Sequence, residues 1–178
     1  MTADVAGRLA GFILATAADD LPDAARERGE ILLIDALACA FAGRHASSRP
    51  GFAAAARAMA GAGHSPVVDD TDASPYAAAL LNGWQVTATT MCDVYRPRML
   101  HVSPVVLPAV LENAGGHRAD AVLAAFVMGV ETALRLADTL ESDLYTGARW
   151  HAPGVVGAFG AVAAAARLRA WDDRTLRS

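Results

Sequence analysis

The sequence has little of what several classes of protein require. Its two cysteines, Cys39 and Cys92, stand far apart, and neither has a second Cys or His at metal-ligand spacing. Neither a disulfide framework nor a zinc site is therefore indicated, and a reducing cytoplasm suits the chain best. Aromatic residues make up only 6% of the sequence. In a chain this rich in alanine, so low a share favours closely packed helices over a sheet.

The sequence also lacks a basic region and a membrane-spanning run. Its formal charge is -4, and no cluster of Lys or Arg could follow a phosphate backbone, which argues against nucleic acid as a partner. The N-terminal apolar run has no basic segment before it, so it predicts a first helix rather than a signal peptide. Charges interrupt the apolar stretch 119–140, and the stretch 152–166 is too short to cross a bilayer.

The sequence does contain a large apolar fraction, together with residues that mark the starts and ends of helices. Hydrophobic residues make up 54% of the 178 residues, enough to exclude disorder and to form the core of one domain, 1–178. Capping residues, first-turn prolines and terminal glycines predict an all-α fold. The expected helices lie near 4–18, 22–42, 51–61, 75–91, 103–114, 119–140 and 153–169, with a last short turn after Asp172. Asp20 is expected to cap the second helix.

Apolar spacing predicts which helix faces are buried. In the second helix the predicted face consists of Ile31, Ile34, Ala38 and Phe41, and in the helix 119–140 it consists of Val122, Phe126, Val130, Leu134 and Ala137. Glu131 and Arg135 stand four residues apart and predict a helix-supporting ion pair. Gly83 and the glycines at 154, 157 and 160 predict close approach of neighbouring helices.

Two polar connectors concentrate the reactive side chains. Between Asn82 and Pro108 the chain carries Asp93, Tyr95, Arg96, Arg98 and His101, and prolines interrupt any helix that continues through them. A second connector delivers Tyr145, Arg149, Trp150 and His151 just before an apolar helix. Polar segments between buried helices are natural places for a site, although solvated loops have the same composition, so both interpretations stay open.

Five blocks, in this order, carry a family resemblance: LAGFILATAADDLPDAARERGEILLIDALACAFAG, AAALLNGW, HVSPVVLPAVLENAGG, AAFVMGVETALRLADTL and HAPGVVGAFGAVAAAARL. Together they resemble the MmgE/PrpD family of 2-methylcitrate dehydratases and cis-aconitate decarboxylases. The resemblance implies the first part of a helical domain from a longer, usually homodimeric enzyme that also has an α+β lid domain. It implies removal or addition of water or carbon dioxide on a small di- or tricarboxylic acid, without a metal or organic cofactor.

Some site residues of the family have a match in this sequence and others do not. His101 and His151 match the active-site histidines of the family and are predicted proton-transfer groups that face one cleft. The family motif HALDFDDT corresponds here to TATTMCDV, in which Thr87, Thr90, Cys92 and Val94 replace the family residues and Asp93 remains, as an orienting acid. Arg96, Arg98 and Arg149 are the candidate carboxylate-binding residues.

Two functions follow from these residues. The first is part of a lyase that needs a missing C-terminal portion or a second chain and is inactive as this chain alone. The second is a degenerate, non-catalytic relative that serves as a structural or dimerisation module. The retained histidines favour the first, and the lost polar residues favour the second. In either case the chain is expected to expose an apolar patch and to self-associate.

Overall fold

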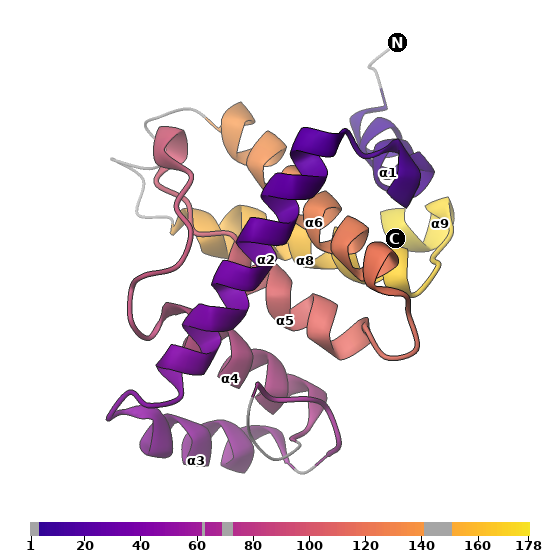
Figure 1. Ribbon diagram of the computed structural model, residues 1–178. Coiled ribbons are helices and arrows are strands. Elements are labelled where there is room, and N and C mark those ends of the chain that lie inside the picture. The colour runs from indigo at the N-terminus through magenta and orange to yellow at the C-terminus, as the bar shows by residue number, and fades with distance from the viewer. Residues whose placement is uncertain (1–3, 62, 69–72, 141–150) are drawn as a thin grey trace.

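The computed structural model describes residues 4–61, 63–68, 73–140 and 151–178, and these residues confirm the all-α prediction (Figure 1). The helices are α1 (Val5–Ala15), η1 (Ala18–Asp20), α2 (Asp23–Gly43), α3 (Arg49–Ala60), α4 (Pro75–Thr87), η2 (Arg96–Arg98), α5 (Ser103–Asn113), α6 (Ala119–Thr139), α8 (Ala152–Leu168) and α9 (Asp173–Arg177). Within these ranges there is no strand, only isolated bridges between Ser65 and Ala73 and between Tyr95 and Leu100. None of the described helices is long and apolar enough to cross a bilayer.

The connection between α1 and α2 differs from the prediction. Helix α1 ends at Ala15, and the chain continues through the short helix η1 instead of reaching residue 18 as one α-helix. Asp20 does not cap α2, because its carboxylate accepts a hydrogen bond from the Ala17 N–H at 2.8 Å. Pro22 occupies the N-cap position of α2 without a side-chain capping bond. The turn of η1 therefore uses the acid that the sequence assigned to the next helix.

Helix α5 lies in the middle of the fold. It packs against α8 and α4, and less extensively against α6 and α2, while α6 and α8 pack along each other. In Figure 1, α2 crosses one side of this group, and α3 lies beyond α4 at the lower end. The core follows this arrangement, since Phe126 of α6 and Leu107 of α5 are both fully buried in one cluster. The start of α5 therefore stands on a packed base.

Glycines set the distance between the central helices. A Cβ atom on Gly160 of α8 would stand 2.5 Å from the carbonyl oxygen of Gly129 in α6, and a Cβ atom on Gly157 would stand 2.9 Å from a Val105 methyl group. A Cβ atom on Gly83 of α4 would lie 2.8 Å from the carbonyl oxygen of Pro104. The predicted close approach is confirmed at these glycines. It is wrong at 154, where the nearest described atom belongs to the side chain of residue 151, at an ordinary contact distance.

The buried face of α2 is not the predicted one. All four predicted residues are exposed, and the buried residues of the helix are Gly29, Ala36, Cys39, Ala40 and Gly43. The physical reason is close packing, because a Cβ atom on Gly43 would collide with the carbonyl oxygen of Gln85 in α4. Small side chains face the body and allow this approach. Ile34 is left 67% exposed on the outside. On α6 the prediction is confirmed, since its stripe is buried or packs against the core.

Polar side chains of α4 hold the segment before it. The amide of the buried Asn82 accepts a hydrogen bond from the Val68 N–H at 2.8 Å and donates one to the Pro66 carbonyl at 2.9 Å. Gln85 donates to the Val68 carbonyl at 3.3 Å. Asn82 therefore serves the fold, although it opens the polar stretch in which the sequence predicted a site.

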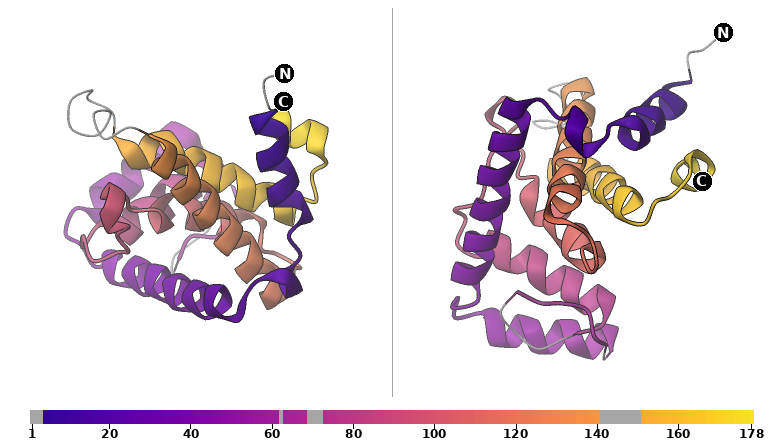
Figure 2. Two further views of the ribbon diagram at one scale, coloured as in Figure 1. Left: turned by 90° about the horizontal axis from the view of Figure 1, so that it is seen from above. Right: turned by 45° about the vertical axis from the view of Figure 1, so that its right-hand side comes forward.

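Helices α1 and α9 lie side by side at one end of the fold, where α1 also contacts α8 and α6 (Figure 2). The Asp4 carboxylate caps α1 by accepting from the Gly7 N–H at 2.9 Å, and it also accepts from Arg177 of α9 at 2.8 Å. Arg167 of α8 donates to the Ile13 carbonyl at 2.8 Å, near the end of α1 where the helix dipole is negative. These contacts tie the first helix to the last two.

Candidate functional site

A cavity of about 370 Å³ lies where the starts of α5 and α8 meet the segment that follows α4. The residues that line it are Thr87, Thr90, Cys92, His101, Pro104, Val105, His151 and Pro153. The structure thus brings His101 and His151 to the wall of one cavity, although they are far apart in sequence. In the described part of the chain, no three His, Cys, Asp or Glu side chains are grouped to hold a metal ion.

His101 is fixed by a backbone hydrogen bond. Its Nδ1 atom lies 2.6 Å from the carbonyl oxygen of Asp93. A carbonyl oxygen can only accept, so Nδ1 must carry the proton in this bond. In the neutral ring Nε2 then has a free lone pair. The arrangement is therefore suited to a ring that accepts a proton at Nε2.

The Asp93 carboxylate holds the start of α5. Its two oxygens accept hydrogen bonds from the N–H groups of Val102, at 3.1 Å, and Ser103, at 3.2 Å. The start of α5 therefore offers few N–H groups to a bound carboxylate, because Asp93 already occupies these two. The N–H groups of Val105 and Val106 bond to the Val102 carbonyl. Asp93 therefore acts on the site by positioning α5 and His101.

His151 stands at the N-cap of α8, where its side chain makes no capping hydrogen bond. Its carbonyl oxygen accepts from the N–H groups of Gly154 and Val155. The first turn of this 17-residue helix carries no acidic residue. The positive end of the α8 dipole is therefore not offset by an acid in that turn, and it favours an anion beside His151.

Cys92 also contacts the Nδ1 edge of His101. Its sulfur lies 3.6 Å from His101 Nδ1, and the residue is 8% exposed. Burial, together with the negative charge of Asp93, raises the pKa of the Cys92 thiol to about 11. Since the thiol is uncharged at neutral pH, a neutral group lies beside the ring.

The chain between α4 and Cys92 turns sharply. Helix α4 ends at Thr87, short of the predicted residue 91, and the Thr90 N–H donates to the Thr87 carbonyl at 2.8 Å. Thr90 has a φ of 54°, a left-handed conformation that is uncommon for a β-branched residue. Sequence reasoning did not place Thr87, Thr90 or Cys92 in the site. Their correspondence to acidic or histidine positions of the family motif was the signal that could have identified them.

The arginine candidates lie elsewhere. Arg98 pairs with Asp138 at the end of α6, with Nε 3.3 Å from the carboxylate and a terminal nitrogen 3.0 Å from the Asp138 carbonyl. Arg96 is exposed on η2. Neither residue lines the cavity, and Arg149 lies outside the described residues. Carboxylate binding by these arginines stays a prediction.

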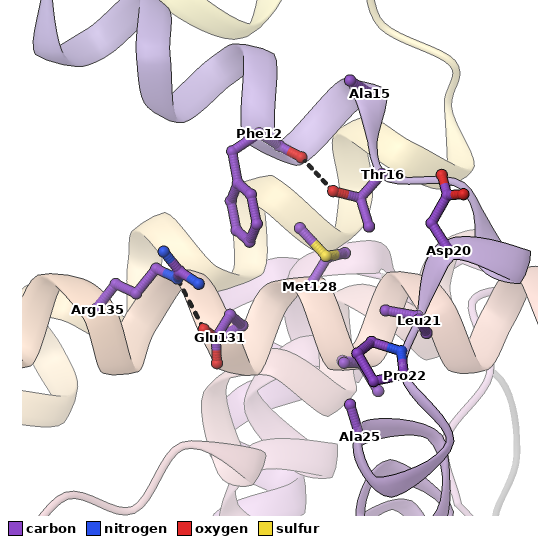
Figure 3. A pocket seen from close by; sticks show the side chains of 11 residues that line it. Phe12, Ala15, Thr16, Asp20, Leu21, Pro22, Ala25, Met128, Glu131 and Arg135 are labelled. Atoms are coloured by element: carbon purple, nitrogen blue, oxygen red, sulfur yellow. Dashed lines mark hydrogen bonds and ion pairs between the residues drawn. The ribbon is translucent and has the colours of Figure 1, made fainter.

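A larger cavity, of about 650 Å³, opens between α1, the start of α2 and α6 (Figure 3). Its polar groups are largely engaged with their neighbours. The predicted pair of Arg135 and Glu131 is confirmed, with Nε 2.7 Å from the carboxylate, and the guanidinium lies over the Phe12 ring at 4.4 Å. The Thr16 hydroxyl donates to the Phe12 carbonyl at 2.8 Å. The contact of Arg135 with Phe12 joins α6 to α1. The histidine cavity is the better candidate for chemistry.

Comparisons with known proteins show what the chain is similar to. A family model, the MmgE/PrpD N-terminal domain, matches residues 7–178. The chain is similar to the cis-aconitate decarboxylase-like protein oryM of Aspergillus oryzae, with 29% identity over 175 residues, covering 93% of this chain and 36% of that protein. It is also similar to the cis-aconitate decarboxylase of Aspergillus terreus, with 29% identity over 161 residues, covering 85% of this chain and 33% of that protein. The chain spans about a third of the length of these curated relatives.

Proposed function

Because the chain belongs to the MmgE/PrpD family, we propose that it forms part of a lyase that acts on a small di- or tricarboxylic acid. The observation that supports this most directly is the shared cavity of His101 and His151. The names of the relatives favour decarboxylation of a substrate like cis-aconitate over dehydration of one like 2-methylcitrate.

Either reaction moves a proton at a carbon atom close to a carboxylate, and it also needs a cationic or N–H environment for the carboxylate. In our proposal His101 transfers the proton through Nε2, because its Nδ1 is held by Asp93. His151 assists from the start of α8, which favours a substrate carboxylate. Asp93 is a positioning residue.

The arginines have unequal parts in this proposal. Arg149 precedes His151 closely in sequence and is the proposed carboxylate-binding residue. Arg98 would have to leave Asp138 before it could reach a ligand. Arg96 is exposed and unlike Arg98 is not held by that carboxylate, so it is the better of the two for a ligand that approaches from outside.

The active protein is proposed to be larger than this chain. In the family, the lid and the later helices complete the pocket, so a C-terminal chain or a homodimer is the proposed active form. The purified chain is therefore expected to show no measurable turnover of cis-aconitate or 2-methylcitrate. Turnover that His101→Ala abolishes would contradict this expectation while supporting the site.

Substrate binding tests the proposal separately from turnover. Adding cis-aconitate is expected to shift the side-chain NMR signals of both His101 and His151, and His101→Ala is expected to weaken these shifts at His151. His117→Ala is the matched control, because His117 is exposed outside the cavity. The absence of shifts at both rings, with cis-aconitate and with 2-methylcitrate, would contradict the proposed substrate class.

A second candidate is a non-catalytic relative. One observation favours it: Thr87, Thr90 and Cys92 line the cavity at positions that correspond to histidine and aspartates in the family motif. Binding of cis-aconitate with no turnover, even in an assembly that contains the C-terminal portion, would favour this candidate.

A further inference from the structure

The Nδ1 edge of His101 has two neighbours of different chemistry. The Asp93 carbonyl oxygen, at 2.6 Å, is a strong acceptor. The Cys92 sulfur, at 3.6 Å, is a weak acceptor and its S–H a weak donor. Both neighbours belong to one short segment, so the identity of residue 92 decides what competes with the carbonyl for the ring proton.

We propose that Cys92 is a positioning residue that keeps His101 uncharged, with its proton on Nδ1, by placing a neutral thiol against this edge of the ring. The proposal rests on the proposed role of His101 in proton transfer. A carboxylate at the same place would accept the Nδ1 proton in a charge-assisted bond and would favour the imidazolium. The imidazolium has no lone pair on Nε2 and cannot accept a proton from a substrate.

The groups around the Nδ1 edge of His101 keep the Cys92 thiol uncharged. Asp93 is on the same segment, but its carboxylate oxygens bond to backbone N–H groups of α5. His151 also lines the cavity. Burial raises the pKa of the Cys92 thiol most, Asp93 and then Cys39 and Asp35 of α2 raise it further, and together they outweigh the one backbone hydrogen bond that lowers it. Because the resulting pKa is about 11, the thiol stays uncharged at neutral pH.

Nitrogen-15 NMR of the histidine rings tests the proposal on the full 178-residue chain. The parent and Cys92→Asn are expected to show His101 as the neutral tautomer with its proton on Nδ1 near pH 8. In Cys92→Asp the midpoint of the His101 titration is expected to rise by about one pH unit or more relative to Cys92→Asn, because an acid within hydrogen-bond distance favours the cation. The signal of His117 is the internal control and is expected to stay in place.

Two results would overturn the proposal. One is a parent ring with its proton on Nε2, and the other is the same titration midpoint in Cys92→Asp and Cys92→Asn. If Cys92→Asp does not fold, Cys39→Ala can be alkylated at Cys92 at alkaline pH, with iodoacetate to add a carboxylate or with iodoacetamide to add a neutral amide. The same difference in midpoint is expected, and equal midpoints would again overturn the role of Cys92.

The test is independent of the proposed enzyme activity. A shifted midpoint without any binding of cis-aconitate would leave the role of Cys92 in place and contradict the proposed function. Binding of cis-aconitate with equal midpoints would support the proposed function and contradict the role of Cys92.

Discussion

Asp93 holds both the start of α5 and the ring of His101. Its carboxylate caps α5 from outside the helix, and Asp93→Ala removes both capping bonds. We expect this substitution to lower the free energy of unfolding by about 1–2 kcal/mol, the usual effect of losing an N-terminal cap. Urea denaturation followed by circular dichroism measures the change.

Asp93→Asn is the matched control, because its side-chain oxygen can still accept one of the two bonds. It is expected to cost less than Asp93→Ala. A loss below about 0.5 kcal/mol in the alanine variant, typical of ordinary surface substitutions, would contradict the capping role.

At the scale of elements, the contact of α6 with α8 depends on two glycines. Gly160→Ala would place a methyl group 2.5 Å from the Gly129 carbonyl oxygen, so the helices must move apart. Overpacking of this kind typically costs about 1–3 kcal/mol. Gly160→Ala is therefore expected to lower the midpoint of thermal unfolding, which circular dichroism measures.

Gly154→Ala on the same helix provides the comparison. Among the described residues its Cβ atom would meet only an ordinary contact, so the gain in helix propensity, up to about 1 kcal/mol, is expected to stabilise the protein. Equal effects of the two substitutions would mean that the crossing of α6 and α8 is looser than described.

Local signals predicted the helices well because they act within a few residues. Ser74 and Pro75 start α4 as expected, and the Ser74 side chain caps it. The buried face of α2 could not be predicted in this way, because apolar residues surround that helix and packing on Gly43 decides which side faces inward. The cap of α5 by Asp93 was equally hidden, since the turn between them follows no periodic pattern.

The histidine pair was predictable only through the family resemblance, because spacing alone left the polar stretch open between a site and a solvated loop. Its surroundings were not predictable. The bond of Arg98 to Asp138 joins two segments that are distant in sequence. The thiol contact of Cys92 with His101 likewise depends on the left-handed turn at Thr90.

At the scale of the whole molecule, the contact between α1 and α9 is expected to weaken in acid. The Gly7 N–H, and to a lesser extent the charge of Arg177, lower the pKa of the Asp4 carboxyl from its ordinary value of 3.8. A lowered pKa in the folded state means that the stabilisation is present above pH 3.8 and is lost as the pH falls through the folded value. The Gly7 amide signal should therefore titrate below pH 3.8.

Arg177→Gln tests the second contribution. It should move the midpoint of the Gly7 signal upward while leaving it below 3.8, because the Gly7 bond remains. A midpoint that does not respond to Arg177→Gln would mean that the ion pair contributes nothing in solution.

The outer surface carries the apolar side chains that the core does not use. Helices α2 and α8 each expose more than one of them. These are Ile31, Ile34 and Phe41 on α2, and Phe159 and Val162 on α8. We expect the chain to self-associate and to bind a hydrophobic dye, measured by sedimentation and by dye fluorescence. Ile34→Lys should reduce both effects, and Glu30→Lys, which adds the same residue at an exposed polar position of α2, should reduce them less. A monodisperse parent monomer that binds no dye would contradict this expectation.

The three hydrogen bonds of Asp93, two accepted by its carboxylate and one by its carbonyl oxygen, have a consequence for inherited variation. A variant at 93 that loosens α5 also releases the ring of His101, so its defect would reach the cell first as a lower amount of protein, since losses of 1–2 kcal/mol change abundance several-fold. A variant at His101 leaves the α5 cap in place and would accumulate at a normal level. Measuring abundance alongside phenotype would therefore separate variants of the scaffold from variants of the site.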